Sequence, residues 1–202
     1  MRIGVLAMQG AFEEHIKALQ ALGVETAEVR LEKDLENIDG IIIPGGESTT
    51  IGKMLDSYNL TDRLISMGKE GFPMFGTCAG MIMLSREIED GLPGQTSLGL
   101  LKVVSCRNAY GRQINSFETD LAIRDLGEKP FRAVFIRAPI ISEVKNNVTI
   151  LAKFQDKIVA VKEDNILALA FHPELTDDYR FHEYFIEMVK GWRKENGKNN
   201  LN

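Results

Sequence analysis

The chain lacks several features that mark particular classes of protein. No stretch approaches the roughly 20 consecutive apolar residues of a membrane helix, and the first residues hold too short an apolar run for an export signal. The two cysteines, Cys78 and Cys106, have no metal-binding spacing. No block of lysine or arginine stands out, and the formal net charge is -5. These absences predict a cytoplasmic protein with no metal, no cofactor, and no affinity for membranes or nucleic acids.

Composition is typical of a single globular domain. The 202 residues are 44% hydrophobic and 26% charged, which is enough for one well-buried core and short for two. We find no internal repeat and no linker-like stretch in the sequence. We therefore expect one domain over residues 1–196 and a frayed polar tail at 197–202.

The first two-thirds of the chain alternates strand-like and helix-like patterns. Apolar runs predict buried strands at 3–8, 24–30, 39–46 and 72–76. Helical spacing of apolar residues predicts helices at 11–22, 48–58, 60–70, 79–88 and 178–194. Ser48 or Thr49 is expected to cap the second of these helices and Thr61 the third. Strands that alternate with helices predict an α/β fold with a mostly parallel sheet.

Beyond Gly91 the pattern changes to short β-rich segments separated by turn residues. These segments predict hairpins or an antiparallel extension of the same sheet. In open α/β sheets, ligands bind beyond the carboxyl ends of the parallel strands. Three polar or glycine-rich features fall at such ends, namely Met8-Gln9-Gly10, the segment 44–48 and the junction at Cys78. We expect their loops to converge on one pocket.

Cys78 lies in Gly76-Thr77-Cys78-Ala79-Gly80, between an expected strand and an expected helix. Glycines on both sides of a central nucleophile permit the tight turn of a nucleophile elbow, and the helix that follows favours the thiolate. The alternative for a buried cysteine is that it serves as a small apolar side chain. The strand-to-helix context favours the nucleophile for Cys78, whereas Cys106 lies in a β-like run and is interpreted as structural.

A thiol nucleophile needs a base, and the chain has three histidines. His15 and His182 fall within expected amphipathic helices, and we interpret them as helix-surface or flanking residues. His172 ends an apolar run and begins His172-Pro173-Glu174, where extended geometry would place Glu174 beside the imidazole. This arrangement predicts a nucleophile, a base and a group that orients the base.

The segment PGGESTT (44–50) can present backbone N–H groups to an anion. Gly45, Gly46 and the N–H of Ala79 are the predicted oxyanion hole, although a plain turn followed by a helix cap explains the same residues. The alternative to substrate binding for Glu47 and Ser48 is N-terminal capping of that helix. Arg107 and Arg137 could each hold a substrate carboxylate, but isolated arginines are more often solvated.

Six segments of the chain together resemble one family. They are LAMQGAFEEH (6–15), PGGESTT (44–50), FGTCAGMI (75–82), RNAYGRQ (107–113), FIRAP (135–139) and FHPELT (171–176). In all of them the chain is similar to the glutaminase subunits of pyridoxal phosphate synthase, which are triad-type (class I) glutamine amidotransferases. It departs from many class I members at Met81-Ile82, where they carry a His-Gln-like pair.

The resemblance implies a flavodoxin-like three-layer α/β/α fold with a mostly parallel central sheet and an antiparallel β-rich extension. It also implies hydrolysis of L-glutamine to L-glutamate and ammonia through a γ-glutamyl thioester. The ammonia would pass to a separate barrel-shaped synthase subunit for pyridoxal 5'-phosphate (vitamin B6) synthesis. The implied assembly is a dozen synthase subunits with up to as many glutaminases, in which the synthase completes the oxyanion hole.

Carried over by position, the resemblance implies that Cys78 is the nucleophile and that His172 and Glu174 complete the triad. It implies that the region of Gln9 faces the synthase. The implied L-glutamine-binding positions are Gly46, Glu47, Ser48, Arg107, Ile136 and Arg137.

Two alternatives use the same core. One is the glutaminase of another triad amidotransferase, or a γ-glutamyl hydrolase, against which the segments RNAYGRQ and FIRAP argue. The other is a binding or regulatory module without activity. The intact set of Cys78, His172 and Glu174 disfavours the second alternative.

Overall fold

The computed structural model describes residues 1–107 and 116–197. Most of the segment RNAYGRQ, at 108–113, and most of the expected polar tail, at 198–202, lie outside the described residues. Within the described ranges, no helix is both long and apolar enough to cross a membrane. The same ranges hold no cluster of histidine, cysteine, aspartate or glutamate with metal-binding geometry.

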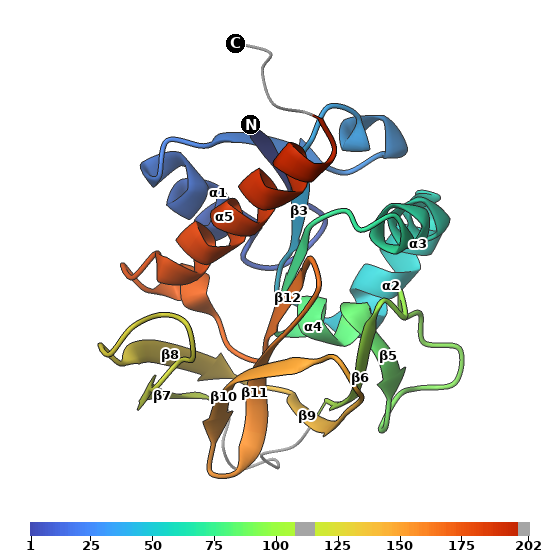
Figure 1. Cartoon of the computed structure of the whole chain (residues 1–202). Helices are drawn as coiled ribbons and strands as arrows, with labels where there is room; N and C mark the ends of the chain where they lie inside the picture. Colours follow the sequence, from blue (N-terminus) through green and yellow to red (C-terminus); the bar gives the residue numbers. More distant parts are fainter. Residues whose placement is uncertain (108–115, 198–202) are drawn as a thin grey trace.

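A parallel core of five strands lies at the centre of the molecule (Figure 1). The spatial order is β2-β1-β3-β4-β12, which is the flavodoxin-like order. These strands are β1 (Arg2–Leu6), β2 (Glu25–Val29), β3 (Gly40–Ile43), β4 (Met74–Thr77) and β12 (Ile166–Leu169). The strands β3, β4 and β12 are fully buried because helices cover both faces. The predicted flavodoxin-like α/β fold is confirmed.

The same sheet continues beyond β12 with mainly antiparallel strands, as predicted. The order continues through β11 (Lys157–Glu163), β9 (Ile140–Val144), β6 (Leu101–Cys106) and β5 (Ser85–Ile88), and β10 (Thr149–Phe154) pairs with β11. Strands β7 (Ser116–Leu121) and β8 (Phe131–Ile136) instead form a separate antiparallel sheet. The β-rich part of the chain therefore divides between two sheets.

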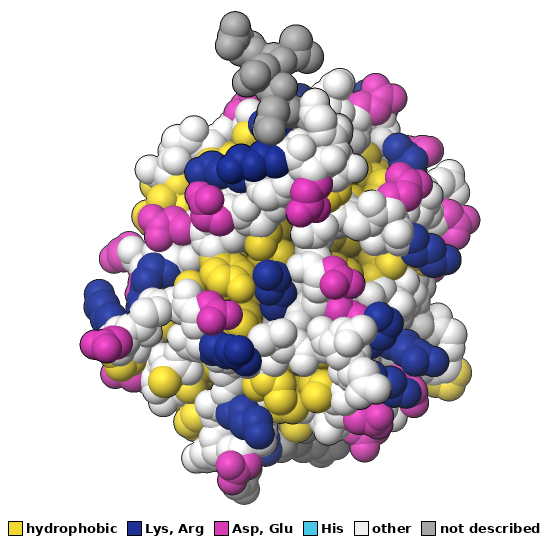
Figure 2. Space-filling model, in the orientation of Figure 1, with side chains coloured by type: hydrophobic (Ala, Val, Ile, Leu, Met, Phe, Trp, Pro, Cys, Tyr) yellow, Lys and Arg dark blue, Asp and Glu magenta, His cyan; other side chains and the backbone are white. Residues whose placement is uncertain are grey.

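Helices form the outer layers on the two faces of the parallel core (Figure 1). On one face lie α1 (Phe12–Ala21) and α5 (Arg180–Glu195), and on the other lie α2 (Ser48–Ser57), α3 (Leu60–Lys69) and α4 (Ala79–Leu84). Two short 3-10 helices complete the elements, η1 (Glu32–Leu35) and η2 (Pro173–Leu175). Figure 2 shows acidic and basic side chains interspersed on the visible face, with apolar side chains between them.

Buried phenylalanines tie the small sheet to the strand that leads into His172. Phe171 is fully buried, and its ring centroid lies 5.4 Å from that of Phe135 on β8 and 5.5 Å from that of Phe181 on α5. The backbone N–H of His172 donates to the carbonyl of Val134 at 2.8 Å. This packing fixes the position of His172 at the carboxyl end of β12.

Two local predictions are wrong. The helix expected over 79–88 ends at Leu84, because residues 85–88 pair with β6 as strand β5. The predicted helix caps also differ. Glu47 caps α2 by accepting from the backbone N–H groups of Thr49 and Thr50. Helix α3 begins after Asn59, and the hydroxyl of Thr61 donates instead to the Asp56 carboxylate at 2.6 Å.

Candidate active site

Cys78 occupies a sharp turn between β4 and α4, as the glycine pattern predicts. Its φ of 50° lies in a region that costs a residue other than glycine about 1–3 kcal/mol. The surrounding packing holds this conformation, since the backbone N–H of Cys78 donates to the Leu169 carbonyl at 2.8 Å. A Cβ at Gly80 would lie 1.8 Å from the Ile43 carbonyl oxygen, so glycine is required there. The turn presents the thiol at the carboxyl end of the parallel core.

His172 and Glu174 meet, but not on an extended strand as predicted. His172 has φ -108° and ψ 88° and precedes η2, so Glu174 lies in a 3-10 turn that begins at Pro173. The turn brings Nδ1 of His172 within 2.7 Å of Oε1 of Glu174. The side chain of Glu174 is fully buried behind the imidazole. The predicted pair is therefore in contact through a different backbone route.

The side chains of His172 and Cys78 both pack against Gly45. A Cβ at this glycine would lie 2.4 Å from Cε1 of His172 and 3.2 Å from Cβ of Cys78, so both side chains border it. Burial opposes a charge on the His172 ring, but hydrogen bonds to Cys78 and Glu174 outweigh it and raise the pKa of His172 to about 10. The ring is therefore an imidazolium at neutral pH, which suits it to stabilise a thiolate and later to donate a proton.

Glu174 contacts a second imidazole that the sequence interpretation placed elsewhere. Its Oε2 lies 3.4 Å from Nε2 of His15, and both side chains are fully buried. Burial raises the pKa of the Glu174 carboxyl, but the neighbouring His15 and the hydrogen bond from His172 outweigh it, so that the pKa is lowered. The carboxylate therefore stays ionised inside the core.

The interpretation of His15 and His182 as surface or flanking residues is wrong. Both are fully buried, and Nδ1 of His15 lies 3.0 Å from Nε2 of His182. Nε2 of His15 also lies 3.1 Å from the Thr77 hydroxyl oxygen. A signal was present in the sequence, because His15 falls at helical spacing from Phe12 and Leu19 on the core-facing stripe of α1.

A cleft of about 440 Å³ opens over the thiol at the carboxyl ends of the parallel strands. It collects every position that the sequence predicts to bind glutamine or to stabilise the oxyanion, and Gln9 as well. Glu174 is not in the lining because it lies behind His172. The lining residues are Gln9, Gly10, Ala11, Gly45, Gly46, Glu47, Ser48, Cys78, Ala79, Ile82, Arg107, Ile136, Arg137, Pro139 and His172.

The loop that follows β3 is braced by the loop that follows β1. Gly10 has a φ of 85°, and a Cβ there would lie 1.6 Å from the carbonyl oxygen of Gly45. The side-chain oxygen of Gln9 accepts from the backbone N–H of Glu47 at 3.1 Å. Only glycine at position 10 allows this close approach. The Gln9 region is thus part of the cleft wall.

Charged groups on one wall of the cleft already have partners. Glu47 lies 3.6 Å from the Arg107 guanidinium, which also donates to the Gln95 side chain at 3.0 Å. Burial raises the pKa of Glu47, but hydrogen bonds from Thr49 and Thr50 outweigh it and lower the pKa to about 2. Glu47 caps α2 and also lines the cleft, so both helix capping and glutamine binding, the two uses that the sequence allows, are compatible with its position.

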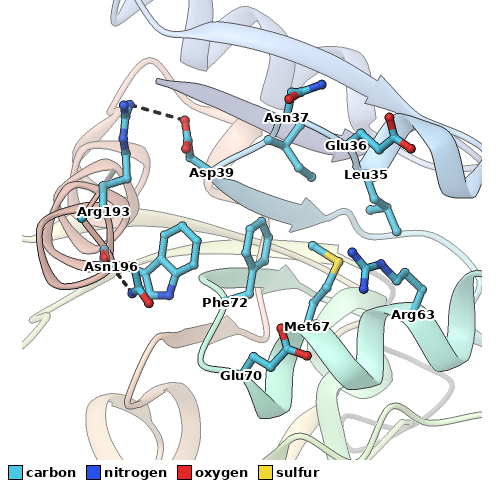
Figure 3. Close-up of a pocket in the computed structure, with 13 residues that line it drawn as sticks. Leu35, Glu36, Asn37, Asp39, Arg63, Met67, Glu70, Phe72, Arg193 and Asn196 are labelled. Atoms are coloured by element: carbon cyan, nitrogen blue, oxygen red, sulfur yellow. Dashed lines mark hydrogen bonds and ion pairs between the residues drawn. The ribbon is translucent and has the colours of Figure 1, made fainter. Parts of the chain in front are cut away.

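A larger cavity of about 940 Å³ lies elsewhere, where β3 and β4 begin (Figure 3). Phe72, Met67 and Trp192 contribute apolar walls, and Arg193 lies 3.4 Å from Asp39 at its edge. The residues described as lining it include no cysteine and no histidine. Because a nucleophile and a base occur together in the smaller cleft, the smaller cleft is the candidate active site.

Comparison with known proteins finds relatives over nearly the whole chain. The sequence profile of the SNO glutamine amidotransferase family matches residues 5–191. The protein named "Pyridoxal 5'-phosphate synthase subunit PdxT" from Carboxydothermus hydrogenoformans is 58% identical over 94% of this chain and 98% of its own length. The protein of the same name from Moorella thermoacetica is 56% identical over 94% of this chain and 100% of its own. A crystal structure of a glutamine amidotransferase has a TM-score of 0.88 at 47% identity, covering 93% of this chain and 98% of that one.

Proposed function

Because the chain belongs to the SNO glutamine amidotransferase family, we propose that Cys78, His172 and Glu174 catalyse the hydrolysis of L-glutamine to L-glutamate and ammonia. The chain is the glutaminase subunit of a pyridoxal 5'-phosphate synthase. One observation carries the assignment of residues. Cys78 and His172 both border Gly45, and Oε1 of Glu174 lies 2.7 Å from Nδ1 of His172.

The first half of the reaction uses the Cys78 thiolate and the His172 imidazolium. The Cys78 thiolate attacks the carboxamide carbon of glutamine, and the carbonyl oxygen becomes an oxyanion. The N–H of Ala79 and the loop at Gly45 and Gly46 stabilise this charge. The His172 imidazolium, whose raised pKa keeps its proton available, donates that proton to the departing nitrogen. Ammonia leaves, and a γ-glutamyl thioester remains on Cys78.

In the second half, neutral His172 takes a proton from water, and the resulting hydroxide attacks the thioester carbonyl. The carbon–sulfur bond breaks, the γ-carboxyl group of the product loses its proton to solvent as glutamate leaves, and the Cys78 thiolate and the His172 imidazolium are restored. Glu174 remains ionised throughout and stabilises the imidazolium through its Oε1.

Glutamine is held by residues on the walls of the cleft. Arg107 or Arg137 neutralises the α-carboxylate, and Glu47 meets the α-ammonium. Gly46, Ser48 and Ile136 line the path of the side chain toward Cys78. Their shared place in the cleft supports this assignment.

Ammonia is used by the synthase subunit, which we propose is barrel-shaped and forms a core of a dozen subunits with up to as many glutaminases around it. The region of Gln9 faces that subunit in this proposal, because the Gln9 loop braces the predicted oxyanion hole. In this proposal, contact with the synthase at the Gln9 loop orients the backbone N–H groups of the Gly45-Gly46 loop toward the oxyanion. We also propose that the complex works in the cytoplasm, where the Cys78 thiol, which forms no disulfide, stays reduced.

The test is glutamate release from glutamine, measured with and without the synthase subunit. Cys78→Ala is expected to lose activity by about 10³-fold or more while it keeps its fold and its binding to the synthase. Cys106→Ala removes the other thiol of the chain and is expected to keep the parental rate. Glutamate release by Cys78→Ala at the parental rate would show that Cys78 is not the nucleophile. A rate that does not change when the synthase is added would contradict completion of the oxyanion hole by the partner.

A further inference from the structure

We propose that His15 is a positioning residue for this reaction, which holds the Glu174 carboxylate from the side opposite His172 and is itself fixed by His182. The inference rests on the proposed glutaminase function for its kinetic consequences and on geometry alone for the contact. It assigns a role to two buried imidazoles that the chemistry described above does not use.

The carboxylate of Glu174 has two oxygens and two imidazole neighbours. Oε1 lies 2.7 Å from Nδ1 of His172, and Oε2 lies 3.4 Å from Nε2 of His15. Among the described residues, Oε2 has no hydrogen-bond partner, and Nε2 of His15 at 3.4 Å is the imidazole nitrogen beside it. A buried ionised oxygen without a donor is costly. The imidazole of His15 is therefore placed to offer an N–H group to this oxygen.

The geometry selects one arrangement of protons on the two buried rings. If Nε2 of His15 carries the proton, the N–H can donate to the Thr77 hydroxyl oxygen at 3.1 Å and lies beside Oε2 of Glu174 at 3.4 Å, while Nδ1 accepts from Nε2–H of His182. Nδ1 of His182, which has no partner among the described residues, then carries no proton. The opposite arrangement would leave a buried N–H of His182 unpaired and aim a lone pair of His15 at a carboxylate.

The ionisation of both rings agrees with this arrangement. Burial lowers the pKa of His15, and burial together with His15 lowers the pKa of His182 to about 3. Both rings are therefore neutral at physiological pH, so that each has one donor and one acceptor nitrogen. His182 fixes which nitrogen of His15 is protonated, and His15 then fixes the rotation of the Glu174 carboxylate.

The groups that face this cluster come from several elements. His15 on α1 faces Glu174 of η2, His172 before it, Thr77 of β4 and His182 of α5, with Glu14 next to it on its own helix. The ring of Tyr179 lies edge-on to His182 at 6.3 Å. Among the described residues, Glu174 is the carboxylate in contact with this pair of rings, at 3.4 Å from Nε2 of His15. Removing the His15 donor should therefore raise the pKa of Glu174.

The kinetic test compares two substitutions in the full chain with its synthase subunit. His15→Phe keeps an aromatic ring against Phe75, whose centroid lies 6.0 Å away, but removes the donor. We expect kcat to fall roughly tenfold to hundredfold with little change in KM, because the base is misoriented while the glutamine contacts remain. The acid limb of the kcat profile should move to higher pH, because the Glu174 carboxylate loses a neighbour that favours its ionised form. A merely structural defect would lower the active fraction without moving that limb.

His15→Gln supplies the conservative variant, because its amide nitrogen can reach the place of Nε2 and donate to Glu174. It is expected to recover most of the rate and the parental acid limb. His182→Phe removes an imidazole that is equally buried but does not contact Glu174, and should cost less than His15→Phe. Equal profiles for the parent and His15→Phe, or no recovery in His15→Gln, would overturn the proposal.

A second measurement does not depend on activity or on a variant that folds. The chain has three histidines, so a ¹⁵N spectrum of the imidazoles in the free subunit resolves three rings. His15 and His182 are expected to be neutral with the proton on Nε2, with no titration near pH 6.5. A ring at either position that titrates near 6.5, or His15 protonated on Nδ1, would refute the arrangement. If the parent releases no glutamate with its synthase, the proposed function fails while this spectrum still decides the contact.

Discussion

Gly45→Ala tests whether the active-site geometry depends on the absence of a single methyl group. The φ of Gly45 is not in the left-handed region, so alanine can adopt its backbone and the effect is steric. The new Cβ would lie 2.4 Å from Cε1 of His172 and 3.2 Å from Cβ of Cys78. Ordinary van der Waals contacts of a Cβ begin at about 3.4 Å, so the His172 ring or its neighbours must move.

The size of the effect follows from these distances. To relieve the contact, the His172 ring must retreat by about 1 Å, from 2.4 Å to 3.4 Å. The backbone of His172 is held by its hydrogen bond to Val134, so the ring rather than the chain is expected to turn. A misplacement of 1 Å costs about 10²-fold in rate. We expect a loss of that order in kcat, with a stability cost of about 1 kcal/mol from overpacking.

The assay is glutamate release in the presence of the synthase subunit, with kcat and KM measured separately and stability measured by urea denaturation. Gly191→Ala in α5 is the matched control, because a Cβ there meets nothing within 4 Å. This control should keep the parental kcat and gain up to about 1 kcal/mol from helix propensity. A kcat of Gly45→Ala within about twofold of the parent would refute the reasoning, since the ring would then tolerate the displacement.

Two further predictions concern pH and capping. The folded pKa of His172, about 10, exceeds the unfolded 6.5, so its stabilisation relative to His172→Gln should be complete below pH 6.5 and lost as pH rises through 10. Urea denaturation across this range checks the sign, and an advantage that grows with pH would contradict it. Glu47→Ala removes the cap of α2 and should lower the free energy of unfolding by about 1 kcal/mol. This difference should shrink as pH falls from 4.5 toward 2, whereas a matched change at exposed Glu195 should have little effect.

Much of the fold could be predicted from local pattern. The all-apolar runs at Ile41–Ile43 and Met74–Phe75 indicate strands covered on both faces, and helices between them indicate parallel crossovers. The elbow at Cys78 could also be predicted from the glycine pattern. The structure explains that pattern, because a Cβ at Gly76 or Gly80 would collide with neighbouring backbone. The resemblance in six segments is also confirmed by relatives that match almost the entire chain.

Other features depended on partners that no local pattern reveals. Ser85 reads as part of a helix, yet it begins a strand because β6 lies beside it. Glu47 caps α2, and it also lies on the rim of the cleft and pairs with Arg107, which is distant in sequence. Nothing near position 72 indicates that a large cavity without histidine or cysteine in its described lining would form there. In each case a neighbour from another element decided the outcome.

By itself, the sequence predicted the parallel core, the turn at Cys78 and the contact between His172 and Glu174. These features follow from residues within a few positions of one another, where strand and helix periodicity and glycine geometry operate. Only the tertiary structure decided that His15 and His182 meet at 3.0 Å across 167 residues of chain. Periodicity can place a side chain on the inner face of a helix. Periodicity does not predict which side chain of another element it will contact, because that depends on how α1 and α5 pack together.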